Sequence, residues 1–107
     1  MRTHPDLFWV RVENSDGLAC LRLTGRLDAA ALVYLGGKID DARGQDVVLD
    51  LGGITFVDDP AWLAVTSFEH RVCGWGGRLQ LVHAQGAIRE RFESPETEHL
   101  LPERGRR

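Results

Sequence analysis

The chain has 107 residues, which is the length of a single domain. Hydrophobic residues make up 43% of it and charged residues 27%, as in an ordinary globular domain, and the net charge of −3 argues against a nucleic-acid or anionic-membrane surface. No apolar run approaches the roughly 20 residues of a membrane span, and the N-terminus has no apolar secretory core. We therefore expect one cytoplasmic domain over residues 1–107, with a core at 7–102 and a basic tail at 103–107.

Residue types that would indicate an enzyme or a metal site are sparse. Cys20 and Cys73 form an isolated pair, which favours reduced thiols over a disulfide in a chain without an export signal. The four histidines are scattered and show no metal-ligand spacing, and the sequence contains neither a nucleophile elbow nor a phosphate-binding glycine loop. The sequence thus predicts a non-enzymatic protein without a metal or cofactor.

The first half of the chain predicts a hairpin followed by a helix. Residues 7–13 alternate between apolar and polar side chains, as in a strand, and a turn at 14–17 leads to a second strand at 18–23. Residues 24–26 lead out of that strand. Asp28 is then well placed to cap a helix that ends near Gly44.

The second half predicts two more strands and two more helices. The apolar run at 47–51 is typical of a strand buried on both faces, and 52–57 continues it. Asp58 and Asp59 before Pro60 mark the start of a helix that ends at 74–77. A fourth strand follows at 79–82 and a third helix at 87–92, with a last apolar anchor at 100–102.

The element order β-β-α-β-α-β-α predicts an α/β fold. We expect a mainly parallel four-stranded sheet, with an antiparallel N-terminal edge strand, covered by helices. Ligands and partners of such sheets usually meet the carboxyl ends of the strands, where loops lead into helices. Asp28 and the pair Asp58/Asp59 all belong to that end, so we look for function there.

Two motifs carry a family resemblance. Residues 24–28 read Thr-Gly-Arg-Leu-Asp, and residues 47–58 end in Phe-Val-Asp. With these motifs the sequence resembles a STAS domain over residues 20–102, and within that family the bacterial anti-sigma factor antagonists. Gly25 to Asp28 match the Gly-x-Leu-Asp motif before the family's first helix, and Asp58 matches the Asp of its Asp-Ser/Thr-x-Gly motif. The stretches 76–79 and 100–102 match later landmarks.

The resemblance implies a binding function. The unphosphorylated family member binds a kinase-type anti-sigma factor, and that serine kinase then phosphorylates the Ser or Thr after the motif Asp, which separates the two proteins. Here the phosphoacceptor position is Asp59, followed by Pro60, and Ala61 stands where the family has Gly. We therefore expect the phosphorylation switch to be absent or fixed. Two interpretations stay open, because Asp59 is either a permanent negative charge or only a second N-cap candidate.

Four residues form the predicted partner-binding surface: Asp28, Asp58, Asp59 and Trp62. Trp62 falls one turn into the second helix and off its main apolar stripe, as an interface anchor would, although core packing is the alternative. Adjacent carboxylates at a helix start are more often a cap than a cation site, so no metal is predicted.

The short stretch after residues 100–102 suggests that this chain could form a homodimer. Family members commonly continue into a further helix after the stretch that corresponds to 100–102. A shortened tail would leave an apolar strip exposed, and a partner or a second copy of the chain would cover it.

Two other functions remain as alternatives. Residues 46–51 resemble the third strand of a phosphoacceptor receiver, with Asp50 as the acceptor. However, a receiver needs a Lys at the end of its last strand, and the only lysine here is Lys38 in the first predicted helix. The other alternative is a STAS scaffold that docks on a transporter or a multiprotein assembly, since such modules often lack a phosphoacceptor.

Overall fold

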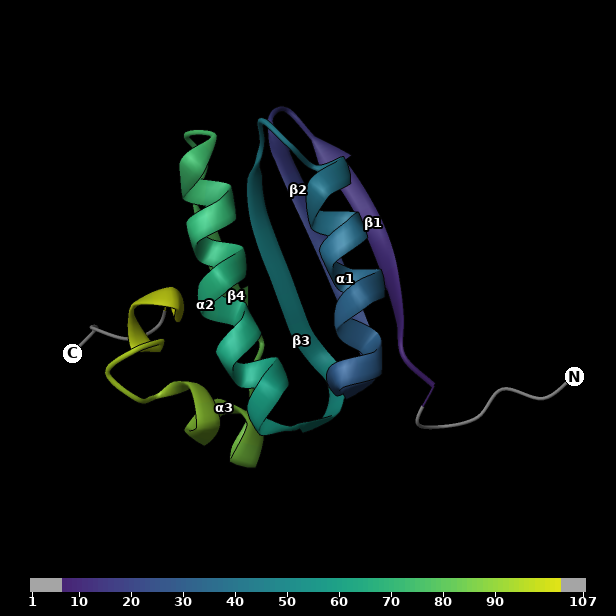
Figure 1. Cartoon of the computed structure of the whole chain (residues 1–107), viewed down its shortest axis with the longest axis vertical. Coiled ribbons are helices and arrows are strands. Elements are labelled where there is room, and N and C mark those ends of the chain that lie inside the picture. The colour runs from purple at the N-terminus through teal and green to yellow at the C-terminus, as the bar shows by residue number, and fades with distance from the viewer. Residues whose placement is uncertain (1–6, 103–107) are drawn as a thin grey trace, which may run out of the picture.

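Four strands form one sheet in the order β1-β2-β3-β4, as predicted, and two long helices pack on it (Figure 1). The computed structural model describes residues 7–102, so the predicted basic tail at 103–107 lies outside the described residues. The elements, in chain order, are β1 (Trp9–Ser15), β2 (Leu18–Leu27), α1 (Ala29–Asp41), β3 (Asp46–Val57), α2 (Asp59–Gly74), β4 (Leu79–Val82), α3 (Gly86–Phe92) and the short 3-10 helix η1 (Glu98–Leu100).

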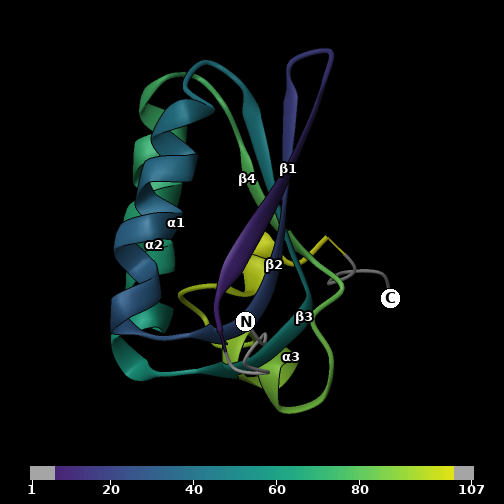
Figure 2. The same ribbon diagram turned by 90° about the vertical axis from the view of Figure 1, so that its right-hand side faces the viewer.

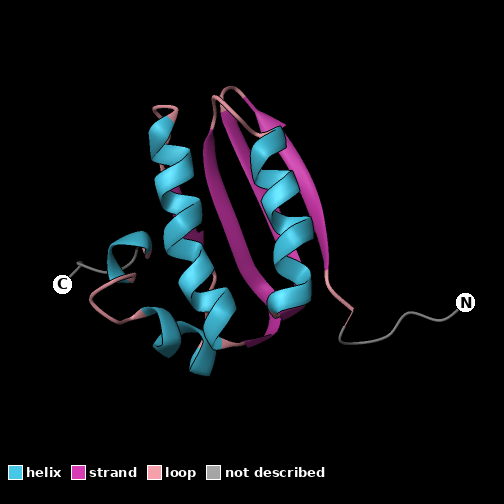
Figure 3. Cartoon of the chain, in the orientation of Figure 1, coloured by secondary structure: helices cyan, strands magenta, loops and turns pink. Residues whose placement is uncertain are grey.

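The sheet is mixed in the way that the element order predicts. β1 pairs antiparallel with β2, whereas β2 with β3 and β3 with β4 are parallel pairs (Figure 3). A two-residue turn joins β1 to β2, with Asp16 at φ 46° and Gly17 at φ 83°. Positive φ at both positions is the type I′ geometry, which matches the twist of the flanking strands. The single α/β domain is thereby confirmed.

β2 continues further than its sequence pattern predicts. The sequence predicts a strand that ends at Leu23, yet β2 extends to Leu27, with Gly25 and Leu27 continuing the alternation of buried residues. Two register irregularities, between Arg22 and Thr24 and between Gly25 and Arg26, keep β2 paired with β3 to the end. The extension carries the chain directly into α1, because Leu27 is followed by the cap of that helix.

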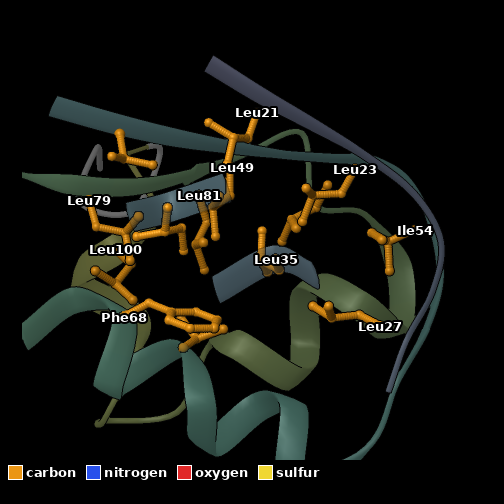
Figure 4. Packing of buried hydrophobic residues seen from close by; sticks show 14 of the residues in the cluster. Leu21, Leu23, Leu27, Leu35, Leu49, Ile54, Phe68, Leu79, Leu81 and Leu100 are labelled. Carbon is orange, nitrogen blue, oxygen red and sulfur yellow. The ribbon is translucent and has the colours of Figure 1, made fainter. Parts of the chain in front are cut away.

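The core lies between the sheet and the helices α1 and α2, which both cover the same face (Figure 2). Leu21 and Leu23 of β2, Leu49 of β3 and Leu35 of α1 are completely buried there (Figure 4). Val48 of β3 points to the opposite face and is only half-buried. The predicted burial of this strand on both faces is therefore only partly correct.

The C-terminal segment is packed rather than exposed. Phe92, Leu100 and Leu101 are buried, and the buried Thr97 hydroxyl donates a hydrogen bond to the Phe92 carbonyl at 2.7 Å. Within residues 7–102, every exposed large apolar side chain precedes residue 64. The described C-terminal segment itself thus exposes no large apolar side chain, and the expectation that a shortened tail uncovers an apolar strip stays a prediction.

Candidate functional site

Asp28 and Asp58 cap the two long helices, as the sequence predicts. The Asp28 Oδ1 accepts a hydrogen bond from the Ala31 N–H at 3.1 Å, and the Asp58 Oδ1 accepts one from the Ala61 N–H at 2.9 Å. Each bond engages a backbone donor of the first helical turn, and the Ala31 N–H also donates to the Asp28 carbonyl at 3.0 Å. Both carboxylates also lie where the positive end of a helix dipole favours a negative charge.

The two caps lie side by side because their strands are parallel neighbours. Leu27, the last residue of β2, pairs with Val57, the last residue of β3, and the Asp58 N–H donates to the Leu27 carbonyl at 3.3 Å. Both helices therefore begin at the same end of the sheet (Figure 1). We call Asp28, Asp58 and Asp59 the acidic edge.

Asp59 is not a cap. It is the first residue of α2, and its carboxylate forms an ion pair with the Arg91 guanidinium of α3. The Asp59 side chain is 80% exposed. Since Asp58 occupies the cap position, the interpretation of Asp59 as a second N-cap is wrong, and its charge remains at the surface of the acidic edge.

Arg91 connects Asp59 to Trp62. The Arg91 Cζ lies 5.5 Å from the centre of the Trp62 ring, within the range of a cation–π contact. Trp62 is half-buried against the core, so it is a packing residue as well as part of the surface. Sequence reasoning missed Arg91 because it lies 32 residues from Asp59, in a short helix with no motif that singles it out.

The Gly25-to-Asp28 motif has a physical basis in the structure. Gly25 has φ 101°, and a Cβ built on it would lie 2.3 Å from the Leu7 carbonyl oxygen, so only glycine fits. The next residue, Arg26, stacks its guanidinium 3.9 Å from the centre of the Phe56 ring. Its Nε is 4.0 Å from the Asp28 Oδ2, which places a cation beside the acidic edge.

An apolar groove runs between α1 and α2, beginning one turn after the acidic edge. Val33 of α1, which lines the groove, is 82% exposed, and Leu63 of α2, next to the lining residue Ala64, is 56% exposed. The groove has a volume of about 530 Å³. It is lined by Leu32, Val33, Gly36, Gly37, Asp40, Ala64, Ser67, Phe68 and Arg71.

On each helix an apolar residue follows the acidic edge by one turn. Leu32, which lines the groove, follows Asp28 by four residues, and Leu63, the neighbour in sequence of the lining residue Ala64, follows Asp59 by four. Sequence reasoning missed Val33 and Leu63 because it considered only the apolar stripe that faces the core. The signal was nevertheless present, since both residues are large, apolar and off that stripe.

Asp50 lies away from the acidic edge, in the middle of β3. Its carboxylate is 3.1 Å from the His83 Nδ1 and 3.5 Å from the Arg22 Nε, and it accepts a hydrogen bond from the Gly52 N–H at 2.9 Å. Burial alone would raise the pKa of Asp50, but these hydrogen bonds and charges outweigh it and hold that pKa below its ordinary value. Lys38 lies on α1, over the Tyr34 ring, so the receiver alternative gains no support.

The remaining tryptophans and cysteines lie outside this surface. Trp75 lies at the C-terminal end of α2, where its Nε1–H donates a hydrogen bond to the Gln45 carbonyl at 2.8 Å. Trp9 lies on β1 and is about half exposed. Cys20 and Cys73 are both free thiols, as expected.

The family model of the STAS domain matches residues 10–102 of this chain. A comparison with curated proteins found no match. Within residues 7–102, no helix has the length and apolar character that crossing a membrane requires.

Several solved structures share the fold. The Bacillus cell fate determinant SpoIIAA in its phosphorylated form superposes with a TM-score of 0.71 at 18% identity, over 87% of this chain and 88% of that one. An anti-sigma factor antagonist from Mycobacterium paratuberculosis gives 0.69 at 20% identity, over 84% and 78%. A murine anion transporter, Slc26a9, gives 0.62 at 19% identity, over 73% of this chain but only 14% of the transporter.

Proposed function

The chain belongs to the STAS domain family, and we propose that it is a regulatory module that binds a kinase-type anti-sigma factor, in the manner of an anti-sigma factor antagonist. The proposed contact surface consists of the acidic edge, Trp62 and the groove between α1 and α2. The proposal involves no catalytic step by this chain. Its action is to occupy a surface of the partner.

The observation that carries the proposal is an exposed charge beside an exposed apolar groove. The Asp59 carboxylate is 80% exposed, and Leu63, one turn later on α2, is 56% exposed. Protein interfaces combine apolar contacts at their centre with charged and polar groups around them. The groove would supply the apolar contacts and the acidic edge would select a partner with a basic rim.

Asp59 would act as a fixed charge in place of a switch. A phosphorylated Ser or Thr carries about −1.5 to −2 charges, whereas a carboxylate carries one and cannot be removed by a phosphatase. The ion pair with Arg91 offsets part of that single charge. We therefore expect this chain to bind its partner with a constant affinity that is weaker than the affinity of a variant with an uncharged residue 59.

The test is a binding comparison between the wild type and Asp59→Ser. Each protein is immobilised and exposed to a lysate of the source organism, and any recovered ATP-binding kinase-type protein is purified and titrated by calorimetry. We expect Asp59→Ser to bind this kinase more tightly and to become phosphorylated by it in the presence of ATP. We expect Leu63→Ser to weaken binding at least tenfold.

A matched control removes the same charge elsewhere. Asp41→Ser changes an exposed residue at the far end of α1 and should leave the affinity unchanged. Equal affinities for wild type and Asp59→Ser would contradict the fixed charge. Recovery of transport components alone, with no kinase-type protein, would instead support the scaffold alternative, which the shared fold of the murine transporter keeps in view.

A further inference from the structure

We propose that a second copy of this chain binds to the free edge of β1, so that two β1 strands run antiparallel about a two-fold axis at Val12. The product would be a dimer with one continuous sheet across both copies. This surface lies on the opposite side of the domain from α2 and α3, and the inference is independent of the partner proposed above.

The outer edge of β1 is open. β1 is the first strand of the sheet and pairs on one side with β2, over a continuous register from Trp9 to Ser15. Figure 2 faces this edge, and no helix or strand within residues 7–102 lies in front of it. Its outward backbone groups are therefore available to another strand.

β1 has few of the features that usually protect an edge strand. Natural edges are shortened, bulged, interrupted by proline, or given charged side chains, lysine above all. The two charged side chains of β1, Arg11 and Glu13, have opposite signs. The seven residues of β1 are Trp-Val-Arg-Val-Glu-Asn-Ser, and they include no lysine, proline or glycine. The register with β2 also shows no bulge. A seven-residue edge strand without a bulge or a proline favours pairing with another strand.

The turn geometry determines which residues offer their backbone. A two-residue turn closes on Ser15 and Leu18, and such a closing pair exchanges backbone hydrogen bonds. Because hydrogen-bonded and non-hydrogen-bonded pairs alternate, Glu13 and Arg11 also bond to β2. The three residues between and beside them direct their N–H and C=O groups outward: Val10, Val12 and Asn14.

A two-fold axis at Val12 uses all three outward residues. Val12 then pairs with Val12 of the second copy, and Val10 pairs with Asn14 of the second copy on both sides of the axis. Each pair exchanges two backbone hydrogen bonds, so about six form in total. Val12 is 40% exposed, beside a hollow of about 240 Å³ between β1 and α1 that leaves room for the second copy's side chains.

The charged side chains of β1 favour the register in which the two-fold axis passes through Val12. With the axis at Val12, Arg11 lies directly opposite Glu13 of the second copy, and the symmetry repeats that pair. An axis at Arg11 would instead place two arginines opposite each other, and an axis at Glu13 would place two glutamates opposite each other. Opposite charges stabilise a cross-strand pair and like charges destabilise it. Of these three registers, only the one centred on Val12 pairs opposite charges.

Arg11 would have a better-placed counter-charge in the dimer than it has in the single copy. Arg11 lies opposite Arg22 in the register with β2, which is a like-charge pair. Its present counter-charge is Glu13 on the same strand, with 3.8 Å between the Arg11 Nε and the Glu13 Oε2, and both side chains are more than half exposed. Glu13 of the second copy would give Arg11 a directly opposite counter-charge on its other side.

Charge reversal tests the proposal through oligomeric state. We expect the wild type to show a concentration-dependent dimer in sedimentation velocity at low salt. Arg11→Glu and Glu13→Arg should each raise the dissociation constant at least tenfold, because each places like charges across the axis. An equimolar mixture of the two variants should dimerise again, since a mixed pair places opposite charges at every position.

Two further variants separate loss of the dimer from loss of the fold and from a general effect of charge. Val12→Pro removes an outward N–H that makes no bond to β2, so it should abolish the dimer while the far-ultraviolet circular dichroism stays native. Glu90→Arg, an exposed charge reversal on α3, should leave the dissociation constant unchanged. A wild type that stays monomeric up to its solubility limit would overturn the proposal. So would a mixture of the two reversed variants that dimerises no better than either alone.

Discussion

Arg91 of α3 and Asp59 of α2 form an ion pair that joins the C-terminal part of the chain to the start of the second long helix. The same guanidinium lies over the Trp62 ring. Asp59, which we propose as a fixed charge, is therefore in contact with α3. A change of charge at position 59 acts on α3 as well as on the surface of the acidic edge.

The strength of this ion pair can be measured by a double-mutant cycle of Arg91→Gln and Asp59→Asn. Because Asp59 is 80% exposed, we expect a coupling free energy of only about 0.2–1 kcal/mol at low salt, decreasing at high salt. Urea unfolding of the wild type, both single variants and the double variant gives this value. Arg78→Gln combined with Asp59→Asn is the control pair, for which additive effects are expected. If the effects of Arg91→Gln and Asp59→Asn on the free energy of unfolding were also additive, this would contradict an ion pair between the two residues.

The helix caps give a second prediction. Asp28→Ala and Asp58→Ala should each lower the free energy of unfolding by about 1 kcal/mol, because each leaves a backbone N–H of the first turn without its acceptor. Asp28→Asn and Asp58→Asn should restore most of the loss, since the amide oxygen can accept the same bond. Denaturant unfolding curves measure all four. A loss as large in Asp59→Ala would contradict the assignment of the cap to Asp58.

The glycine of the Gly-x-Leu-Asp motif gives a third prediction. Gly25→Ala should destabilise the fold by about 2 kcal/mol or more, because the new Cβ would meet the Leu7 carbonyl oxygen and φ would remain positive. Thermal unfolding measures the loss.

Gly37→Ala is the matched control for Gly25→Ala. Gly37 lies in α1, and a Cβ there meets nothing within 4 Å. This variant should therefore raise the free energy of unfolding by about 0.5–1 kcal/mol, as alanine favours a helix over glycine. Equal effects of the two substitutions would show that close approach to Leu7 does not constrain Gly25.

Local signals predicted most of the fold. The cap at Asp28, the Asp-Pro start of α2 and the apolar spacing of each helix depend on neighbours within a few residues, so they are legible in sequence. The end of β2 was missed because pairing with β3 continues it past Thr24. A strand's length is decided partly by its neighbour, and that neighbour is distant in the chain.

The candidate site was only partly predictable for the same reason. The acidic edge was found because its carboxylates lie next to helix starts. Arg91 was not found, because its contact with Asp59 depends on how α3 folds back beside α2. Val33 and Leu63 were readable as exposed, because each lies off the core-facing stripe of its helix. The groove itself depends on how α1 and α2 pack together, and the pattern of either helix alone does not contain it.

The Asp50 carboxyl gives a prediction about pH. Its pKa is held below the ordinary value in the folded state by Gly52, His83 and Arg22, although burial opposes this. Such a group stabilises the fold above its unfolded pKa of about 3.9 and loses that contribution as the pH falls through its folded pKa. Asp50→Asn should therefore cost about 1–2 kcal/mol at neutral pH, and this deficit should shrink progressively below about pH 4.

Urea unfolding of wild type and Asp50→Asn across a pH series tests the sign directly. Asp41→Asn is the matched control, because it also removes one carboxylate but at an exposed position at the end of α1. A deficit of Asp50→Asn that stays constant from neutral to acid pH would mean that the lost packing, and not the carboxylate charge, explains the cost. A deficit that grows with acid would contradict the lowered pKa, since only a group with a raised folded-state pKa contributes more stability as the pH falls.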